Sequence, residues 1–470
     1  MTSFYVKNFG CRATQADGAA IERQFKERGL VAAGSAHQAG IVVLNTCTVT
    51  ASADQDARAA IRRIHRENPN CQIVVTGCYA QRAPEEIAGL SGVQKVVGNS
   101  HKHRLAEIAL ATSRSRSDAN ATLVSLSGVQ NSASKRESPL FVSDIFAHTE
   151  LLAAPVFDAA NERTRPNLKV QDGCNNRCSF CVIPYVRGQS RSLPLESVLR
   201  EVTALVEAGY REVVISGINL GRWGRDLIAS AGSKNLRFED LIHSILDRTS
   251  LEKLRISSVE PMDWSDDLIT LVAKSLRIAK HAHVPMQSGS DRVLRLMHRK
   301  YRPWHYREKI EKIRAAMPAA AIGADVMVGF PGETDTEFEQ TRQMIEALPF
   351  TYLHVFTYSP RPGTPAAAMP DQVPVNVARE RNRILRELAE QKKLAFMRSF
   401  MGRDLEAITL NVVRSGLDRE FTEALTDNFL KLRLAGKHEA NRWLKVGIER
   451  VEGGFLSGVV SDTSSTNPVR

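Results

Sequence analysis

The chain has 470 residues, of which 43% are hydrophobic and 24% are charged; this is the composition of ordinary globular proteins and predicts roughly two to four domains. The formal net charge of +11 and a pI of about 9.4 exclude an acidic scaffold and favour a polyanionic partner. A mean hydropathy of −0.23, with no long apolar run and no signal-peptide core, predicts a cytoplasmic protein without a membrane partner.

The N-terminal part, residues 1–110, alternates short apolar runs with helical patterns. Strands are predicted at Ser3–Asn8, Gly40–Leu44 and Cys71–Thr76, and helices at Gln15–Arg28 and Ala51–Arg66. Strands that alternate with helices are typical of a parallel sheet. We therefore expect a Rossmann-like α/β domain in this part of the chain.

Residues 111–155 break this pattern. The stretch Thr112–Ser138 contains eight serines and few large apolar residues, a composition that is typical of linkers and long surface connections. We therefore expect a serine-rich connection between two domains.

The alternation returns over residues 156–395. Six strands are predicted, at Leu168–Gln171, Val213–Ser216, Leu254–Ser257, Ala282–Pro285, Ala321–Val328 and Tyr352–Phe356. Helical patterns fill most of the intervals, among them Pro194–Gly209 and Phe238–Asp247. Repeated β/α units in one block predict a barrel or a partial barrel.

The last part of the chain begins with a basic helical stretch, Arg379–Arg403, which has eight Lys or Arg against three Glu. Such a stretch is either a solvated helix face or a contact for nucleic-acid phosphates. Residues 396–465 then show short alternating runs at Leu405–Val413, Phe429–Leu434, Trp443–Glu452 and Gly458–Val460. These runs predict a small all-β module.

The chain has an odd number of cysteines, namely Cys11, Cys47, Cys71, Cys78, Cys174, Cys178 and Cys181. Disulfides are not expected in a reducing compartment. Grouped cysteines therefore indicate metal, cluster or redox chemistry.

Three cysteines form the motif Cys174-Asn-Asn-Arg-Cys178-Ser-Phe-Cys181, directly after a predicted strand and Gly173. Structural zinc and electron-transfer clusters normally take four protein ligands. A set of three thiolates therefore predicts a cluster with one open iron, where a substrate or cofactor binds. The alternative is a zinc knuckle whose fourth ligand lies elsewhere, although the sequence has no second paired C-x2-C.

Three other cysteines, Cys11, Cys47 and Cys78, each follow a predicted strand. The carboxyl ends of the strands in a parallel sheet converge on one crevice, where three thiolates can hold a second cluster. The alternative is that they are ordinary buried core cysteines. Cys71 begins its strand instead of following it and is expected to be structural.

The Cys174 motif resembles the CxxxCxxC hallmark of the radical S-adenosylmethionine (SAM) superfamily, which follows the first strand of a partial (β/α)6 barrel. The resemblance implies that Cys174, Cys178 and Cys181 bind a 4Fe–4S cluster whose open iron chelates SAM. It extends to Ser216-Gly217-Ile-Asn219 and to Ser257-Ser-Val-Glu260-Pro261. The residues predicted to bind SAM are Ser216, Gly217, Asn219, Glu260 and Gln287, and no catalytic residue is predicted beyond the cluster ligands.

The order of the six grouped cysteines is similar to that of the methylthiotransferases, which hold an auxiliary 4Fe–4S cluster on three N-terminal cysteines. The stretches Val182–Gly188, His283–Asp291, Gly329–Thr334 and His354–Pro365 agree with this family. The resemblance implies that Cys11, Cys47 and Cys78 bind the auxiliary cluster. It also implies that the C-terminal β module is a TRAM domain, an RNA-binding barrel.

Within the family, Asn45-Thr-Cys47-Thr-Val-Thr50 and Gln171-Asp-Gly-Cys174 resemble the branch that acts on N6-threonylcarbamoyladenosine in tRNA. The implied function is methylthiolation at C2 of that adenine, beside the anticodon. Isopentenyladenosine in tRNA and a ribosomal protein are alternative substrates. A non-catalytic RNA-binding metalloprotein is a more distant alternative.

The resemblance implies two 4Fe–4S clusters and SAM as cofactors. The implied partners are the tRNA anticodon stem-loop, an electron donor such as flavodoxin or ferredoxin, and a sulfur donor. Asp325, Arg187 and Tyr185 are candidates for direct contacts at the site, with packing or surface roles as the alternative. His283 lies two positions before Pro285 and is expected to be a packed barrel histidine and not a ligand.

Overall fold

The computed structural model describes residues 2–111, 139–148, 151, 164–227, 236–415 and 419–461. The predicted serine-rich stretch therefore lies outside the described residues. The chain divides into two compact units, residues 1–48 with 52–148 and residues 49–51 with 149–470. None of the helices in the described part is both long and apolar enough to cross a membrane.

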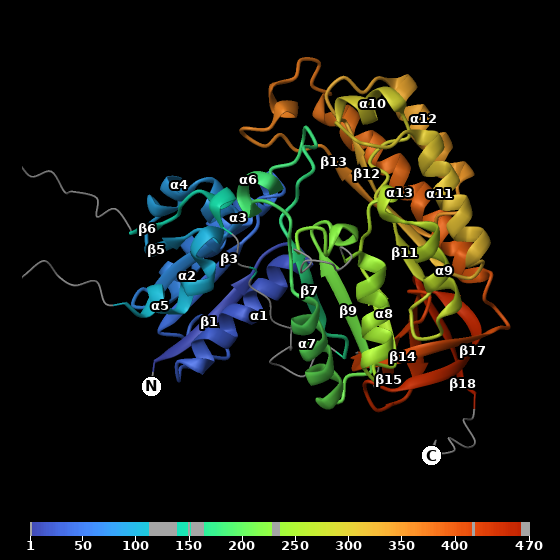
Figure 1. The fold of residues 1–470 in the computed structure, drawn as a ribbon, viewed down its shortest axis with the longest axis horizontal. Coiled ribbons are helices and arrows are strands. Elements are labelled where there is room, and N and C mark those ends of the chain that lie inside the picture. Colours follow the sequence, from blue (N-terminus) through green and yellow to red (C-terminus); the bar gives the residue numbers. More distant parts are fainter. Residues whose placement is uncertain are drawn as a thin grey trace, which may run out of the picture. The chain divides into compact units, whose positions relative to one another are not determined.

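The first unit is built on a six-stranded parallel sheet in the order β2-β1-β3-β4-β5-β6 (Figure 1). Its strands are β1 (Ser3–Asn8), β2 (Val31–Ala32), β3 (Ile41–Thr46), β4 (Gln72–Gly77), β5 (Val93–Val97) and β6 (Leu140–Phe141). Its helices are α1 (Arg12–Glu27), α2 (Ala51–Glu67), α3 (Cys78–Arg82), α4 (Pro84–Ala88), α5 (Leu105–Leu110), η1 (Asn99–Arg104) and η2 (Ile145–Ala147). The expected parallel α/β sheet is confirmed.

The strands β2, β5 and β6 were not predicted from the sequence, for two different reasons. Both β2 and β6 have only two residues, which is too short to show any periodicity. The apolar pattern of β5 is interrupted by Lys95, whose ammonium is nevertheless buried because it donates to the carbonyls of Ile108, Ala109 and Ala111. A buried lysine whose ammonium is hydrogen-bonded to carbonyls at a helix end cannot be distinguished from an exposed lysine by the sequence alone.

The second unit contains six parallel strands that form a partial barrel. They are β7 (Asn167–Asp172), β9 (Glu212–Gly217), β10 (Lys253–Ile256), β11 (His281–His283), β12 (Ala321–Val328) and β13 (Tyr352–Thr357). The strands form one sheet ordered β10-β9-β7-β8 and another ordered β11-β12-β13, and β8 (Arg191–Ser192) is an antiparallel edge. A parallel bridge between Leu254 and Ile278 continues the wall between the two sheets.

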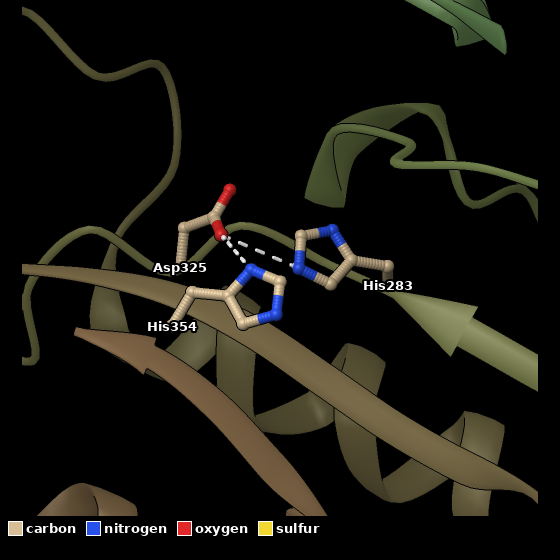
Figure 2. Close-up of side chains that lie close together, drawn as sticks. All are labelled: His283, Asp325 and His354. Carbon is tan, nitrogen blue, oxygen red and sulfur yellow. Dashed lines mark ion pairs between the residues drawn. The ribbon is translucent and has the colours of Figure 1, made fainter. Parts of the chain in front are cut away.

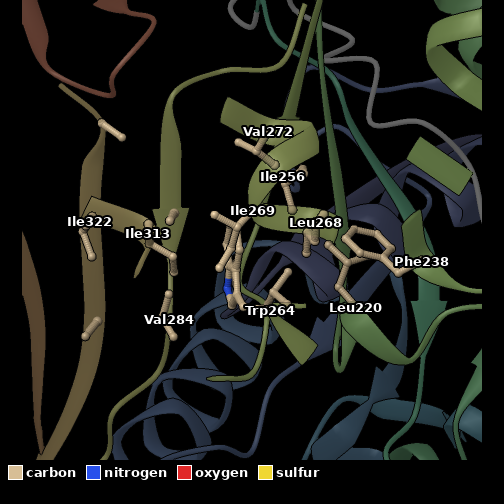
Figure 3. Packing of buried hydrophobic residues seen from close by; sticks show 14 of the residues in the cluster. Leu220, Phe238, Ile256, Trp264, Leu268, Ile269, Val272, Val284, Ile313 and Ile322 are labelled. Atoms are coloured by element: carbon tan, nitrogen blue, oxygen red, sulfur yellow. The ribbon is translucent and has the colours of Figure 1, made fainter. Parts of the chain in front are cut away.

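Helices connect the barrel strands and pack outside them. They are α6 (Ile183–Arg187), α7 (Leu195–Glu207), α8 (Phe238–Arg248), α9 (Asp266–Lys274), α10 (Asp291–Leu296), α11 (Pro303–Ala316) and α12 (Asp335–Ala347), with the short turns η3 (Leu220–Arg222), η4 (Pro261–Asp263) and η5 (Pro365–Ala368). Figure 3 shows part of the resulting core, to which Trp264, Leu268 and Ile256 belong. Full burial of each such aliphatic side chain stabilises the fold by about 1.5–3 kcal/mol.

The C-terminal module is a closed five-stranded barrel, as expected, in the order β14-β15-β16-β18-β17. It follows the long helix α13 (Val375–Arg398), and its strands are β14 (Asp404–Ser415), β15 (Arg419–Thr426), β16 (Lys431–Ala435), β17 (Trp443–Glu452) and β18 (Phe455–Val460). The sequence missed β15. Its segment REFTEALT carries three charged residues, so its alternation is weaker than that of its neighbours.

Helix α13 exposes less unpaired positive charge than its sequence suggests. The Arg381 guanidinium is buried and lies 2.7 Å from a carboxylate oxygen of Glu333. The exposed Arg383 is bound to both Glu380 and Glu387. Several of the cations in the basic stretch therefore serve the fold.

The closed C-terminal barrel packs against the partial barrel of the second unit, at the N-terminal ends of the partial barrel's strands. Arg255 is buried, binds Glu212 with an Nε–Oε1 distance of 2.7 Å and donates to the carbonyl of Asp427. The ring of Phe429 stacks on that of His281 at 4.3 Å. The C-terminal ends of the same strands, at the other end of the barrel, carry the loops with the predicted site residues.

Candidate active site

The loop that carries Cys174, Cys178 and Cys181 begins at the C-terminal end of β7. Gly173 has a φ of +70°, and a Cβ at this position would lie 1.9 Å from the carbonyl oxygen of Gln189. Only glycine allows this close approach. The turn brings the three cysteines, all partly buried, to the end of the barrel strands.

Three N–H groups point at sulfurs of this loop. The backbone N–H of Asn176 lies 3.4 Å and the amide nitrogen of Asn219 3.7 Å from Cys174 Sγ. Arg299 Nη1 lies 3.3 Å from Cys178 Sγ. Hydrogen bonds to cluster sulfurs are among the factors that set reduction potential.

Arg299 is a functional candidate that the sequence analysis missed. Besides Cys178, its guanidinium binds the carboxylate of Glu260, a predicted SAM-binding residue. Arg299 lies 121 positions after Cys178, and nothing in the local sequence indicates that the two meet.

Burial raises the pKa values of two of the three thiols in this loop. Burial, and after it the neighbouring Cys178 sulfur, raise the pKa of Cys181 to about 12. Burial also raises the pKa of Cys174. Thiols with raised pKa values stay protonated in the ligand-free chain, and a cationic iron centre displaces these protons on binding. Three sulfur donors in one short loop are the chemistry that iron–sulfur clusters require.

Two buried polar atoms beside this loop lack hydrogen-bond partners within the described part of the chain. They are Ser216 Oγ, at the end of β9, and Asn219 Oδ1. The backbone N–H of Asn219 donates to Gln171 Oε1 at 2.7 Å, which ties the end of β9 to β7. Buried polar atoms are costly unless they find a partner, so this corner fits a polar ligand such as SAM. A Cβ on the adjoining Gly217 would lie 2.8 Å from Gln171 Oε1.

The other predicted SAM residues have distinct surroundings. Glu260 precedes η4 and is engaged by Arg299. Gln287 has a φ of +63°, and its backbone bonds to Asp325 and Met327 in β12 hold it there. Such a conformation costs a non-glycine residue about 1–3 kcal/mol, and such strain is concentrated at functional sites.

Arg187 lies behind the cysteine loop. It is buried and binds Asp172, which also binds Lys169 at 2.8 Å. Burial raises the pKa of Asp172, but Arg187 and Lys169 lower it more, to well below the ordinary value. This geometry gives Arg187 a supporting role under the loop. Tyr185 is exposed and lies under the guanidinium of Arg177.

The first unit gathers its three cysteines from neighbouring strands. Cys11, Cys47 and Cys78 follow β1, β3 and β4, and these strands are adjacent and in parallel register, with Thr46 beside Gly77. A Cβ on Gly10, which has a φ of +89°, would lie 2.7 Å from Cys47 Sγ. The turn after β1 therefore passes directly over Cys47 because residue 10 has no side chain.

The three cysteines differ in exposure. Cys11 is exposed, whereas Cys47 and Cys78 are buried. Cys11 occupies the N-cap position of α1, and Cys78 is the first residue of α3. Helix N-termini favour negative charge, which fits a thiolate-ligated cluster. Cys71, by contrast, precedes β4 and packs in the hydrophobic core.

A buried polar network supports this end of the sheet. Lys102 Nζ lies 2.9 Å from Asp17 Oδ2 and 3.3 Å from Asn45 Oδ1. Asn45 in turn donates to Asn8 and to the carbonyl of Thr14. The network joins α1, β1, β3 and η1, and it fixes the strand ends that the cysteines follow.

Comparisons with known proteins agree with the two halves of this architecture. Residues 3–98 match the model described as "Uncharacterized protein family UPF0004", and residues 168–345 match the radical SAM superfamily. The "Threonylcarbamoyladenosine tRNA methylthiotransferase MtaB" of Bacillus subtilis is 36% identical and aligns over 98% of both chains. The protein of the same name from Aquifex aeolicus is 34% identical over 94% of this chain and 98% of that one.

Two further comparisons show how far the similarity extends. The "tRNA-2-methylthio-N(6)-dimethylallyladenosine synthase" of Novosphingobium aromaticivorans is 33% identical over 86% of both chains. Among solved structures, the radical SAM methyltransferase TsrM from Kitasatospora setae superposes with a TM-score of 0.55, covering 78% of this chain and 75% of that one. At 15% identity this is a likeness of fold.

Proposed function

The chain belongs to the tRNA methylthiotransferases of the radical SAM superfamily, and we propose that it methylthiolates C2 of N6-threonylcarbamoyladenosine beside the anticodon of tRNA. The observation that carries the proposal is the pair of three-cysteine sets, one at the end of a barrel strand and one across three adjacent sheet strands. The relatives that carry this substrate in their name align with nearly the whole chain.

In this proposal the two cysteine sets hold the two 4Fe–4S clusters. Cys174, Cys178 and Cys181 hold the cluster that binds SAM, and Cys11, Cys47 and Cys78 hold the auxiliary cluster. When bound, the clusters and SAM would supply the radical chemistry that removes the hydrogen from an unactivated C–H bond and the methylthio group that takes its place.

The remaining work of the protein is binding, orientation and exclusion of water. Ser216 Oγ and Asn219 Oδ1 have free hydrogen-bonding capacity, and the side chain of Asn219 also lies beside Cys174. We assign both residues to the polar groups of SAM, with Gly217 allowing close approach. Glu260 and Gln287 complete that set. Phe180, which packs edge-on against Phe330 at 6.4 Å, shields the loop from water.

The proposed tRNA surface includes one face of the C-terminal barrel. The Arg433 guanidinium in β16 lies 3.7 Å from the ring centroid of Phe455 and 4.6 Å from that of Phe421, and Lys431 lies 5.6 Å from Phe455. All four side chains are at least partly exposed. Cations set among aromatic rings suit a partner with both phosphates and unpaired bases, as the anticodon stem-loop has.

The tRNA surface has its own test. Arg433→Ala is expected to weaken tRNA binding and to lower the slope of log affinity against log salt by about 1. Arg442→Ala, which removes another partly exposed arginine bound to Glu439, is the matched control. Equal effects of both substitutions would remove this face of β16 from the proposed interface.

The proposal requires further partners. A radical SAM enzyme needs a reductant, and flavodoxin or ferredoxin suits this role. Loss of sulfur to the product requires a sulfur donor that restores it.

The decisive experiment supplies the reconstituted enzyme with SAM, a reductant and either of two tRNAs. One tRNA carries N6-threonylcarbamoyladenosine and the other isopentenyladenosine, and nucleosides are analysed by mass spectrometry. We expect the 2-methylthio product from the first tRNA only. Product from the second tRNA alone would mean that the chain belongs to the branch that acts on isopentenyladenosine. About one zinc and no iron per chain, in place of about eight iron atoms, would exclude the enzyme altogether.

A further inference from the structure

Three metal-ligating side chains meet on the inner wall of the barrel. His283, Asp325 and His354 come from the neighbouring parallel strands β11, β12 and β13, and Asp325 is in register with His354. The next residues along β12, Ala324 and Val326, belong to the hydrophobic core on the other face. Figure 2 shows the two imidazole rings and the carboxylate pointing toward one another.

The three ligand atoms are close together. His283 Nε2 lies 3.4 Å and His354 Nδ1 3.5 Å from the same oxygen, Asp325 Oδ1. All three atoms lie within 4.8 Å of one another, and within the described residues no other group of three His, Cys, Asp or Glu does so. The set contains no sulfur and none of the six grouped cysteines.

These distances distinguish a cation site from a simple hydrogen-bonded pair. Charge-assisted N–H···O bonds are about 2.7–2.9 Å long. Ligands held at about 2.0–2.1 Å from a tetrahedral Zn²⁺ lie roughly 3.3–3.4 Å from one another. The two nitrogen–oxygen distances agree with the second value.

The hydrogen-bond surroundings of His283 agree with a cation site. Its Nδ1 lies 2.6 Å from Ser258 Oγ, whereas its Nε2 is buried without a hydrogen bond. A metal-binding histidine almost always donates from its second nitrogen to a nearby acceptor, which leaves a lone pair for the metal. When Nδ1 donates to Ser258 Oγ in this way, Nε2 and the Asp325 carboxylate face each other as two electron donors, and a cation between them satisfies both.

The ring of His283 is held in this position before any ion arrives. It stacks on Tyr352 at a centroid distance of 5.9 Å, and the Tyr352 hydroxyl is bonded to His281 at 2.7 Å. The Tyr352 ring fills the space where a Cβ of Gly323 would be, at 2.0 Å. His354, with 55% of its side chain exposed, leaves one side of the group open.

We propose that His283, Asp325 and His354 bind a divalent transition-metal ion of the zinc class, with a coordination position open to water or substrate. The donor set of two imidazoles and one carboxylate suits Zn²⁺ and Fe²⁺. An ion here acts as a Lewis acid on an oxygen atom of a substrate in the barrel. This assignment replaces the expectation that His283 is only a packed histidine, and it does not depend on the identity of the tRNA substrate.

The test uses the full chain with its clusters reconstituted, so that cysteine thiols do not compete for the added metal. The protein is incubated with Zn²⁺ and desalted, and zinc is counted and examined by X-ray absorption at the zinc edge. We expect about one zinc per chain with only nitrogen and oxygen ligands at about 2.0–2.1 Å. His354→Ala and Asp325→Asn should each lose it, and His305→Ala, at an exposed position in α11, should keep it.

A milder variant separates a metal site from a folding defect. Ser258→Ala leaves all three ligands in place and removes only the acceptor of His283, so zinc affinity should fall about 10–100-fold while the thermal unfolding midpoint is unchanged. Three results would overturn the proposal. They are no zinc retained by the parent chain, zinc with sulfur ligands, and equal zinc retention by His354→Ala and His305→Ala.

Discussion

The two sets of three cysteines are built in opposite ways. Cys174, Cys178 and Cys181 lie in one loop of eight residues, whereas Cys11, Cys47 and Cys78 follow three different strands of the first unit. The supporting ion pairs differ in the same sense. Asp172 binds Lys169 and Arg187, which are 3 and 15 positions away, and Asp17 binds Lys102, which is 85 positions away.

This contrast shows what holds each site in shape. The loop set depends on local turn geometry at Gly173 and on a few long-range N–H···S contacts. The strand-end set exists only when β1, β3 and β4 are paired in register, because a slip by one residue would turn the following cysteine to the other face of the sheet. The first set is a property of a segment and the second is a property of a fold.

The largest expected effect comes from the loop set. Cys174→Ala should reduce formation of 5′-deoxyadenosine from SAM to background, because the cluster loses one of its three protein ligands. Cys71→Ala, at a core position outside both sets, is the control and should retain SAM cleavage. Persistent 5′-deoxyadenosine in the Cys174 variant would refute the assignment of this cluster.

The strand-end set should separate the two halves of the reaction. Cys47→Ala is expected to keep SAM cleavage but to lose the methylthio product, because only the auxiliary cluster is affected. Both products are measured in one assay by liquid chromatography and mass spectrometry. A normal yield of methylthiolated nucleoside would mean that Cys47 is an ordinary core cysteine and not a cluster ligand.

A smaller effect is expected at Arg299, the long-range contact of the loop set. Arg299→Lys keeps the charge but loses the planar fork that reaches both Cys178 and Glu260. Activity should fall about 10–100-fold, as for other residues that orient metal ligands, and the midpoint potential of the cluster should shift. The control is Arg302→Lys, at the N-cap of α11, which should change neither the activity nor the midpoint potential.

The smallest effect is one of stability and concerns the strand-end set. Lys102→Met removes the buried cation that faces the buried Asp17 carboxylate, which should lower the local free energy of opening by about 3–5 kcal/mol. Hydrogen exchange of peptides from β3 and β4 measures this change. Arg63→Ala removes an exposed ion pair with Glu67 and should cost about 0–1 kcal/mol. Equal decreases in the free energy of opening for the two variants would mean that the buried pair of Lys102 and Asp17 does not stabilise the ends of these strands.

Much of the fold could be predicted because its strands are short, apolar and bounded by helical patterns. Val42–Leu44 and Ile73–Val75 are buried on both faces, and such runs are recognisable in the sequence. The strand β5 could not be predicted, because the buried Lys95 ammonium donates to carbonyls that only the folded chain brings near. The cysteine positions after three strands were visible, but their adjacency required the strand order.

The sequence by itself determined the motif of Cys174, Cys178 and Cys181, the β/α alternation and the family, because each depends on residue types at short and fixed spacing. Only the tertiary structure decided that Arg299 reaches Cys178 and that His283, Asp325 and His354 meet. Arg299 and Cys178 are 121 positions apart, so only the folded barrel brings their loops together. His283, Asp325 and His354 meet because parallel pairing of β11, β12 and β13 sets their register.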